Sequence, residues 1–190
     1  MVDYPVNRGY GGALRAGFER ALTTGAEAIF LMDSDGQFDI AELAGFLPLL
    51  VNYDGVFGYR INRQDPFLRK LNTWAWRQLV RAVFRIRARD IDCAFKLLRA
   101  DFVRHTNLEA TGAMFSSELL ARFVRAGLRF AEVGVRHYPR NGGKPTGAQP
   151  MVILRAFKEL WFLRPSIMKG PSCNTSSVST ENTKQEIVPD

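Results

Sequence analysis

The sequence contains little cysteine and histidine, and it has no apolar run long enough to cross a membrane. Only Cys93 and Cys173 occur among the 190 residues, together with two histidines. They are too few for a disulfide framework and lack the spacing of a metal site, which fits a reducing compartment. No segment approaches the roughly 20 apolar residues of a transmembrane helix, and no signal peptide is recognisable. We therefore expect a cytoplasmic protein that is not integral to a membrane by itself.

Acidic residues are also in the minority, and the imbalance lies in one segment. The chain carries 26 Lys and Arg against 19 Asp and Glu, a formal charge of +7. Residues 60–89 contain nine basic residues and one acid, Asp65, which gives that segment +8 by itself. Such a patch indicates an anionic partner, and nucleic acid, phospholipid headgroups and a phosphorylated substrate all fit.

Short apolar runs that alternate with helical patterns predict an α/β fold. A glycine-rich turn feeds a first helix, and two buried strands, 28–32 and 55–59, flank a helical pattern over 43–51. This alternation indicates a mainly parallel sheet with covering helices. Further elements are expected as a helix from Pro66, a strand over 95–98, a helix over 117–126, a strand over 130–138 and a helix over 150–163. We expect one domain over residues 1–164 and a disordered polar tail over 165–190.

The motif Asp33-Ser34-Asp35-Gly36-Gln37 follows directly after the apolar run 28–32. Open α/β sheets bind their ligands at the carboxyl ends of the strands, where these carboxylates project. Carboxylate and amide oxygens suit Mg²⁺ or Mn²⁺, which share substrate phosphates with one or two carboxylates. A solvated Asp-rich turn is the alternative. The position at a strand end favours a metal–phosphate site.

Two of the predicted helices combine apolar and basic residues. In the helix after residue 66, arginines recur every four residues from Arg77 to Arg85, which fits either a solvated face or contact with an anion or a membrane surface. The helix over 150–163 ends in Trp161 and Phe162. Packing against the sheet and docking at a membrane interface are both open for it.

Several short motifs occur in a fixed order along the chain. They cover residues 7–18, 32–38, 58–60, 90–96, 115–120 and 137–140. Together they resemble the family-2 glycosyltransferases, and in particular the dolichyl- and polyprenyl-phosphate sugar transferases, over roughly residues 5–163. The resemblance implies a GT-A fold, which is a Rossmann-like α/β architecture.

The same resemblance implies a metal-dependent inverting hexosyltransferase. A sugar would pass from a nucleotide-sugar donor, a UDP- or GDP-sugar, to a polyprenyl phosphate or a related lipid or glycan. Mg²⁺ or Mn²⁺ would bridge the donor's diphosphate and neutralise the charge of the leaving group. Such an acceptor implies peripheral contact at the inner face of the membrane, and no nucleic-acid partner is expected.

Site residues are implied position by position. The metal ligands would be Asp33, Asp35 and Gln37. The contacts to donor or acceptor phosphates would be Gly11, Gly12, Arg60 and Arg140, since backbone N–H groups and guanidinium forks suit phosphate. The catalytic candidates are Asp35 and, for orienting the acceptor, Asp90, Asp92 and Glu118. A structural role is equally open for the last three.

The sequence also departs from the family's pattern. The family's usual first strand with Pro-x-Tyr-Asn-Glu and the second strand ending in Asp-Asp-Gly-Ser do not occur in the 190 residues. They would take about 60–70 residues, because one βαβ unit needs 30 or more. Ala94 and Ser116 replace a usual Gly and a common Asp. We therefore expect an N-terminally truncated domain with an incomplete nucleotide pocket, and inactivity of this chain alone is an open expectation.

Two other functions remain open at this stage. The basic segment 60–89 fits a nucleic-acid-binding module, but it contains no recognisable nucleic-acid motif. The interleaved Trp74 and Trp76 fit helix packing or a membrane face better. An incomplete domain also fits a non-catalytic partner or a regulatory remnant.

Overall fold

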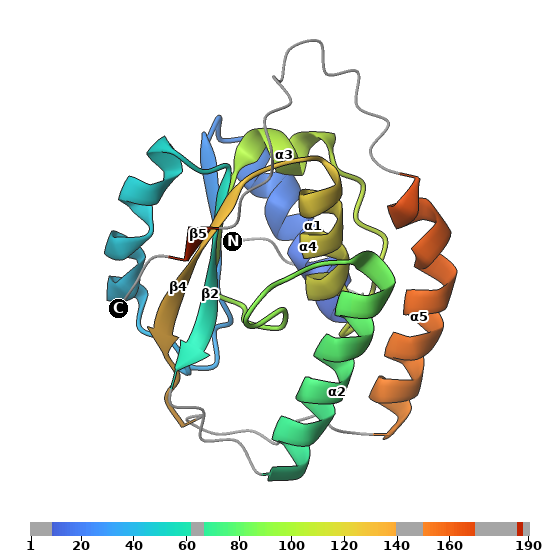
Figure 1. The fold of residues 1–190 in the computed structure, drawn as a ribbon. Helices are drawn as coiled ribbons and strands as arrows, with labels where there is room; N and C mark the ends of the chain where they lie inside the picture. Colours follow the sequence, from blue (N-terminus) through green and yellow to red (C-terminus); the bar gives the residue numbers. More distant parts are fainter. Residues whose placement is uncertain (1–8, 62–66, 140–149, 170–185, 188–190) are drawn as a thin grey trace.

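A five-stranded sheet lies at the centre of the fold, with helices packed against it (Figure 1). The computed structural model describes residues 9–61, 67–139, 150–169 and 186–187. The strands follow the order β1-β3-β2-β4-β5. They are β1 (Ala28–Leu31), β2 (Gly55–Ile61), β3 (Lys96–Arg99), β4 (Phe130–Arg136) and β5 (Glu186–Ile187). The predicted α/β class is confirmed.

Strand β3 runs against the other four. It is antiparallel to β1 and to β2, whereas β2–β4 and β4–β5 are parallel pairs. The sheet is therefore mixed, although the sequence predicted a mainly parallel one. The difference arises after β2, because the chain passes through α2 (Phe67–Phe84) and enters β3 from the sheet edge that it had just left.

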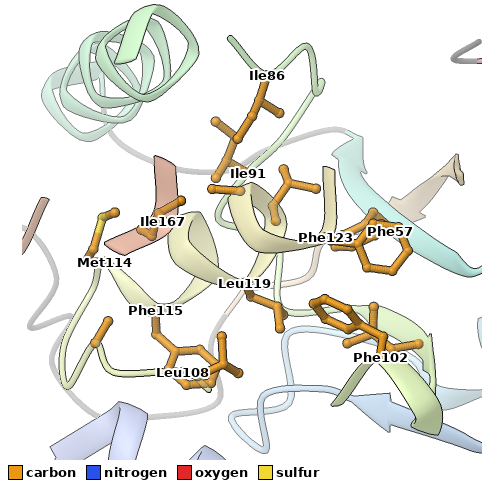
Figure 2. Packing of buried hydrophobic residues seen from close by; sticks show 14 of the residues in the cluster. Phe57, Ile86, Ile91, Phe102, Leu108, Met114, Phe115, Leu119, Phe123 and Ile167 are labelled. Carbon is orange, nitrogen blue, oxygen red and sulfur yellow. The ribbon is translucent and has the colours of Figure 1, made fainter. Parts of the chain in front are cut away.

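One face of the sheet packs on the main core. Phe57 of β2, Leu98 of β3 and Phe130 of β4 belong to this core. The ring of Phe57 packs edge to face on that of Phe123 (Figure 2). The covering helices are α1 (Gly9–Leu22), α2, α3 (Ala100–His105), α4 (Phe115–Arg125) and α5 (Pro150–Met168). Among the helices of the described residues, none is both long and apolar enough to span a bilayer.

The opposite face packs on a smaller core. Successive residues of a strand point to opposite faces, so Val56, Leu97 and Ala131 turn to this second side. Phe46 packs against them from two short 3₁₀ helices, η1 (Ile40–Gly45) and η2 (Leu47–Val51).

These two 3₁₀ helices replace the single helix predicted over 43–51. Asp39 caps the first one by accepting the N–H of Ala41 at 2.9 Å. Pro48 lies in the first turn of the second one and has no N–H to donate. A continuous ladder of hydrogen bonds is therefore interrupted between them.

Helix α5 extends further than predicted. It continues through Pro165 to Met168, so the boundary expected after residue 164 falls inside a helix. Of the remaining tail, Glu186 and Ile187 pair with Ala131 and Glu132 of β4. Residues 170–185 and 188–190 lie outside the described residues, so their disorder stays a prediction.

The glycine-rich segment forms the start of α1 and not a turn before it. Gly9 has a φ of +72°, and the N–H of Gly11 donates to the carbonyl of Thr111 at 3.0 Å. A Cβ atom on Gly11 would lie 2.1 Å from the carbonyl oxygen of Ala110. Gly11 therefore lets α1 pack directly on the backbone of residues 110–111.

We predict that Gly11→Ala lowers the free energy of unfolding by about 1–3 kcal/mol, the usual cost of overpacking. Gly17→Ala is the matched control, because Gly17 lies in the same helix and a Cβ there meets nothing within 4 Å. That control should raise the stability by about 0.5–1 kcal/mol. Urea unfolding of the three proteins measures both effects, and equal effects would contradict the packing role.

Candidate active site

A cavity of about 400 Å³ lies at the edge of the sheet where several strands meet. Strands β1, β2 and β4 end at this edge, and the antiparallel β3 begins there. The polar side of the cavity is lined by Asp33, Gln37, Arg60, Asp92 and His137. Open α/β sheets bind ligands at this edge. Residues far apart in the sequence therefore meet where a ligand is expected.

Two helices supply the other side of the cavity. The lining residues there include Ala75 and Trp76 of α2 and Val152, Ile153, Ala156 and Phe157 of α5. The rings of Trp76 and Phe157 meet edge to face, with centroids 5.5 Å apart. The Nε1–H of Trp76 donates to the hydroxyl of Ser117 at 3.1 Å, which fixes the indole. The cavity thus has one charged side and one largely apolar side, to which Asn72 and Thr73 of α2 add polar groups.

Asp33 is held by a tyrosine of α1. The Tyr10 hydroxyl donates to Asp33 Oδ1 at 3.3 Å, and its ring packs edge to face on Phe115. Burial and the charge of Asp33 raise the pKa of Tyr10, so the hydroxyl keeps its proton and remains a donor. Tyr10 was not predicted as a site residue. Its place between two glycines was the one signal in the sequence.

Asp35 and Gln37 form a tight turn that joins β1 to the end of β4. Asp35 Oδ1 accepts the N–H of Gln37 at 3.1 Å, and Gly36 between them has a φ of +75°. Gln37 Nε2 donates to the carbonyl of Tyr138 at 3.2 Å, and the Tyr138 N–H returns a bond to Gln37 O at 3.0 Å. Asp33 and Gln37 line the cavity, whereas Asp35 lies half-buried beside it.

Arg60 forms a buried ion pair with Asp90. Its Nε and Nη2 donate to the two carboxylate oxygens at 2.6 and 2.9 Å, and both side chains are only 8% exposed. Burial works to lower the pKa of Arg60, but the bonds and charge of Asp90 outweigh it and raise the pKa, so the guanidinium stays ionised. Arg60 lines the cavity, although its Nε and Nη2 atoms donate to Asp90 and not to the cavity.

The same carboxylate organises the segment before β3. Asp90 also accepts the backbone N–H groups of Arg60 and Asp92, at 3.3 and 3.2 Å. Of these two predicted acids, Asp92 lines the cavity and Asp90 does not. Asp90 therefore acts as a support that positions Arg60 and Asp92.

A buried lysine also holds this segment in place. Lys96 is 1% exposed, and its ammonium donates to the carbonyl of Cys93. Burial lowers the pKa of Lys96, against the opposing charges of nearby acids. Burial likewise raises the pKa of the Cys93 thiol to about 11. The segment 90–96 is thus held by two side chains of its own, Asp90 near its start and Lys96 at its end.

Glu118 has the surroundings of a structural acid, one of the two roles that the sequence left open. Its side chain is fully buried in α4, where it accepts the N–H groups of Glu109 and Ala110 and pairs with Arg122 at 2.7 Å. It does not line the cavity. These contacts occupy the carboxylate in holding residues 109–110 on α4, so the structure does not bring Glu118 to the site as an acceptor-orienting group.

Of the remaining predicted residues, Gly11 and Gly12 do not line the cavity. Gly11 and Gly12 are buried inside α1, and the close approach to Ala110 explains Gly11 without a phosphate. Arg140 lies outside the described residues. In addition to Tyr10, Ser116 and His137 line the cavity without having been predicted as site residues, although both lie in motifs that carry the resemblance.

The polar side of the cavity suits a divalent cation that shares its ligands with a bound phosphate. Within the described part of the chain, no three His, Cys, Asp or Glu side chains are grouped so that they could hold a metal. Asp33 and Asp35 supply two carboxylates, and Gln37 supplies an amide. Mg²⁺ commonly binds through one or two carboxylates plus substrate phosphates. Asp33 and Gln37 at the cavity, with Asp35 beside it, are the residues that could hold such an ion where a diphosphate completes its shell.

Comparison with known proteins identifies two sugar transferases as relatives, while no family model matches the chain. The undecaprenyl-phosphate mannosyltransferase of Micrococcus luteus is 30% identical over 146 residues, which cover 72% of this chain and 59% of that protein. The dodecaprenyl-phosphate galacturonate synthase of Rhizobium johnstonii is 28% identical, over 75% of this chain and 42% of that protein. The chain thus spans about half the length of these relatives.

Solved structures give the fold. Glucosyl-3-phosphoglycerate synthase from Mycobacterium tuberculosis, in complex with Mn²⁺, UDP and glucosyl-3-phosphoglycerate, superposes with a TM-score of 0.64 at 16% identity, over 97% of this chain and 65% of that one. Its complex with Mn²⁺, UDP-glucose and glycerol 3-phosphate gives 0.61 at 17% identity, over 89% of this chain and 58% of that one. The protein has the GT-A glycosyltransferase fold, as the sequence predicted. Its similarity to the polyprenyl-phosphate sugar transferases of family 2 is confirmed.

We predict that Asp90→Asn costs about 3–5 kcal/mol of stability, because it leaves the buried Arg60 charge without its counterion. Asp101→Asn is the control. It weakens an ion pair with Arg104 whose side chains are 50% and 73% exposed, and such a pair contributes about 0–1 kcal/mol. Urea unfolding at neutral pH compares the two variants.

A double variant, Arg60→Met with Asp90→Asn, separates the charge from the packing. If the unpaired charge causes the loss, removing it should recover part of the stability. A double variant as unstable as the sum of its single variants would contradict this account.

Proposed function

We propose that this protein is a metal-dependent inverting glycosyltransferase that moves a sugar from a nucleotide-sugar donor to a polyprenyl phosphate. One observation carries the proposal. A cavity at the ligand-binding edge of a GT-A fold joins the Asp33–Gln37 motif, Arg60 and Asp92 on one side to an apolar wall on the other. A polyprenyl phosphate has a charged head and an apolar tail, and a sugar nucleotide has a charged diphosphate, so the two sides match the two substrates.

The donor is proposed to bind at the polar side of the cavity. Asp33 and Asp35, with Gln37, would hold Mg²⁺ or Mn²⁺ against the diphosphate of a UDP- or GDP-sugar. When bound, the ion supplies a positive charge that neutralises the leaving nucleoside diphosphate. Tyr10 keeps Asp33 in place through its hydroxyl, and the turn at Gly36 fixes Asp35 and Gln37.

The acceptor is proposed to enter along the apolar wall formed by α2 and α5. Its phosphate oxygen would attack the anomeric carbon from the face opposite the leaving group, which inverts the configuration. A phosphate is already ionised at neutral pH, so the step needs no dedicated base. Arg60 and Asp92 lie on the polar side of the cavity, where the donor atoms that Arg60 keeps beside its ion pair with Asp90 would bind the phosphate and Asp92 would help to orient the acceptor.

The basic segment supports this function better than nucleic-acid binding. Arg60 is paired with Asp90, Arg77 and Arg81 donate to the carbonyls of Arg89 and Ala88, and the Arg89 guanidinium lies over the ring of Tyr59. Several of the charges that formed the patch are therefore used inside the protein. A continuous basic surface would be expected for a nucleic-acid partner.

Metal-dependent binding of the donor tests this proposal. The experiment therefore titrates Mn²⁺ in the presence of millimolar UDP-glucose or GDP-mannose and follows free Mn²⁺ by electron paramagnetic resonance. Asp33→Asn and Asp35→Asn should each weaken Mn²⁺–nucleotide binding about tenfold or more, the scale seen when groups that support a metal are removed.

Asp39→Asn is the matched control. Asp39 is an exposed carboxylate shortly after the motif, and asparagine caps a helix as well as aspartate does. Its binding should equal that of the unmodified chain. The proposal is contradicted if all three variants bind alike. It is also contradicted if the unmodified chain fails to bind Mn²⁺ in the presence of either nucleotide sugar.

A further inference from the structure

A second cavity, of about 580 Å³, lies where α3, α4 and α5 end. Its walls come from the segments 105–109, 122–126 and 162–169. Small-molecule sites commonly have volumes of about 300–1,000 Å³. Among the described residues, none lines both this cavity and the one at the edge of the sheet. It is therefore a separate cavity, and the proposed sugar transfer makes no use of it.

Three polar side chains in its wall are held by bonds to one another. Arg122 Nη2 donates to Glu109 Oε1 at 2.9 Å and to the Ser166 hydroxyl at 3.1 Å. The Ser166 hydroxyl in turn donates to Glu109 Oε1 at 3.0 Å. Behind them, Arg122 Nε donates to the fully buried Glu118 at 2.7 Å. Among the described residues, no bond involves Glu109 Oε2 or Arg122 Nη1, so a fixed acceptor and a fixed donor remain for a ligand.

The charges around the second cavity cancel. Arg122 is paired with Glu109 at 2.9 Å and with Glu118 at 2.7 Å. Lys169 supplies a second positive charge, so two cations are balanced by two carboxylates. His105 is paired with an acid of its own helix at 3.4 Å. The wall therefore has no excess of positive charge that would select an anion.

Two further features act against a small ion as the ligand. Helices α4 and α5 both end at this cavity, and the C-terminal end of a helix carries a partial negative charge that disfavours anions. In the part of the chain that the structure describes, no three His, Cys, Asp or Glu side chains are grouped to hold a metal. A neutral ligand with many hydrogen-bonding groups fits the second cavity better than either kind of ion.

The wall has a hydrogen-bonding part and an apolar part. Thr106 and Asn107 add a hydroxyl and an amide to the fixed groups of the wall, so that it both donates and accepts hydrogen bonds. The Phe162 side chain is 79% exposed, so a ligand can reach the flat face of its ring. The apolar part consists of Phe162, Leu163, Pro165 and Ile167.

We propose that the second cavity binds a neutral saccharide. A pyranose ring carries hydroxyl groups that donate and accept around its edge, and its C–H groups form apolar faces. The hydroxyls would bond to Asn107, Glu109 and Arg122, and a C–H face would lie on the ring of Phe162. An apolar wall with a few fixed polar groups is the usual composition of a small-molecule site. This site goes beyond the proposed function and does not rest on it.

Saturation-transfer difference NMR on the full 190-residue chain tests the site. The methyl glycosides of glucose, mannose and galactose are added in turn at millimolar concentration, with neither metal nor nucleotide. At least one of them should bind with a Kd in the millimolar range, as expected for a ligand of this size. Asn107→Leu should raise that Kd at least about fivefold, because the donor and the acceptor of the amide are lost together.

Asn72→Leu is the matched control. Asn72 and Asn107 are both exposed, but Asn72 lines the cavity at the edge of the sheet, so the control should bind the glycoside like the unmodified chain. Far-ultraviolet circular dichroism checks the fold of each variant. Should Asn107→Leu unfold, Phe162→Ala takes its place and should weaken binding to a similar extent. Its side chain is largely exposed, so its removal leaves the core intact.

Four results would overturn the proposal. None of the glycosides receives saturation, or Asn72→Leu weakens their binding as much as Asn107→Leu does, which would place the sugar in the other cavity. Glycerol binds as well as the glycosides, which would show that any hydroxyl compound is accepted. Inorganic phosphate displaces the glycoside, which would make the cavity an anion site. Each of these results leaves the Mn²⁺–nucleotide experiment untouched, and failure of that experiment leaves the saccharide site untouched.

Discussion

The buried ion pair between Arg60 and Asp90 is the contact on which the candidate site depends most. Asp90 accepts four hydrogen bonds, from the backbone and side chain of Arg60 and from the backbone of Asp92. It thereby ties the end of β2 to the segment that precedes β3. Lys96 secures the same segment from inside the sheet. These contacts help to hold Asp92 at the cavity.

The antiparallel β3 gives this ion pair its place. Because β3 starts at the edge where β1, β2 and β4 end, the segment before it lies among the loops that follow the other strands. The Asp33–Gln37 motif, Arg60, Asp92 and His137 are then brought around one cavity. A strand entering from the opposite edge would have removed Asp92 from the site.

The two sides of the cavity have different physical origins. The polar side consists of groups at strand ends, which the rigid sheet holds at fixed distances. The apolar side belongs to α2 and α5, whose inner surfaces complete the core while their outer surfaces carry exposed aromatic residues. This division agrees with one substrate that is a charged nucleotide and another that is a lipid phosphate.

Part of this arrangement could be predicted from the sequence. The apolar run before Asp33 has the length and composition of a buried strand, and the motif behind it indicated the correct edge of the sheet. The direction of β3 could not be predicted, since a strand of four residues carries no sequence signal for its orientation in the sheet. The packing role of Gly11 could not be predicted, because Ala110, which it approaches, lies about a hundred positions away in the sequence. Glu118 shows the same limit: its partners Glu109, Ala110 and Arg122 are evident only in three dimensions.

The central claim is that Asp33 and Asp35 form half of a metal site that a nucleoside diphosphate completes. Linked binding tests it most directly, by measuring the affinity for Mn²⁺ with and without a saturating concentration of UDP or GDP. The account predicts that one of the two nucleotides tightens Mn²⁺ binding by about tenfold or more, a coupling of about 1.4 kcal/mol. Equal Mn²⁺ affinity in all three solutions would contradict it.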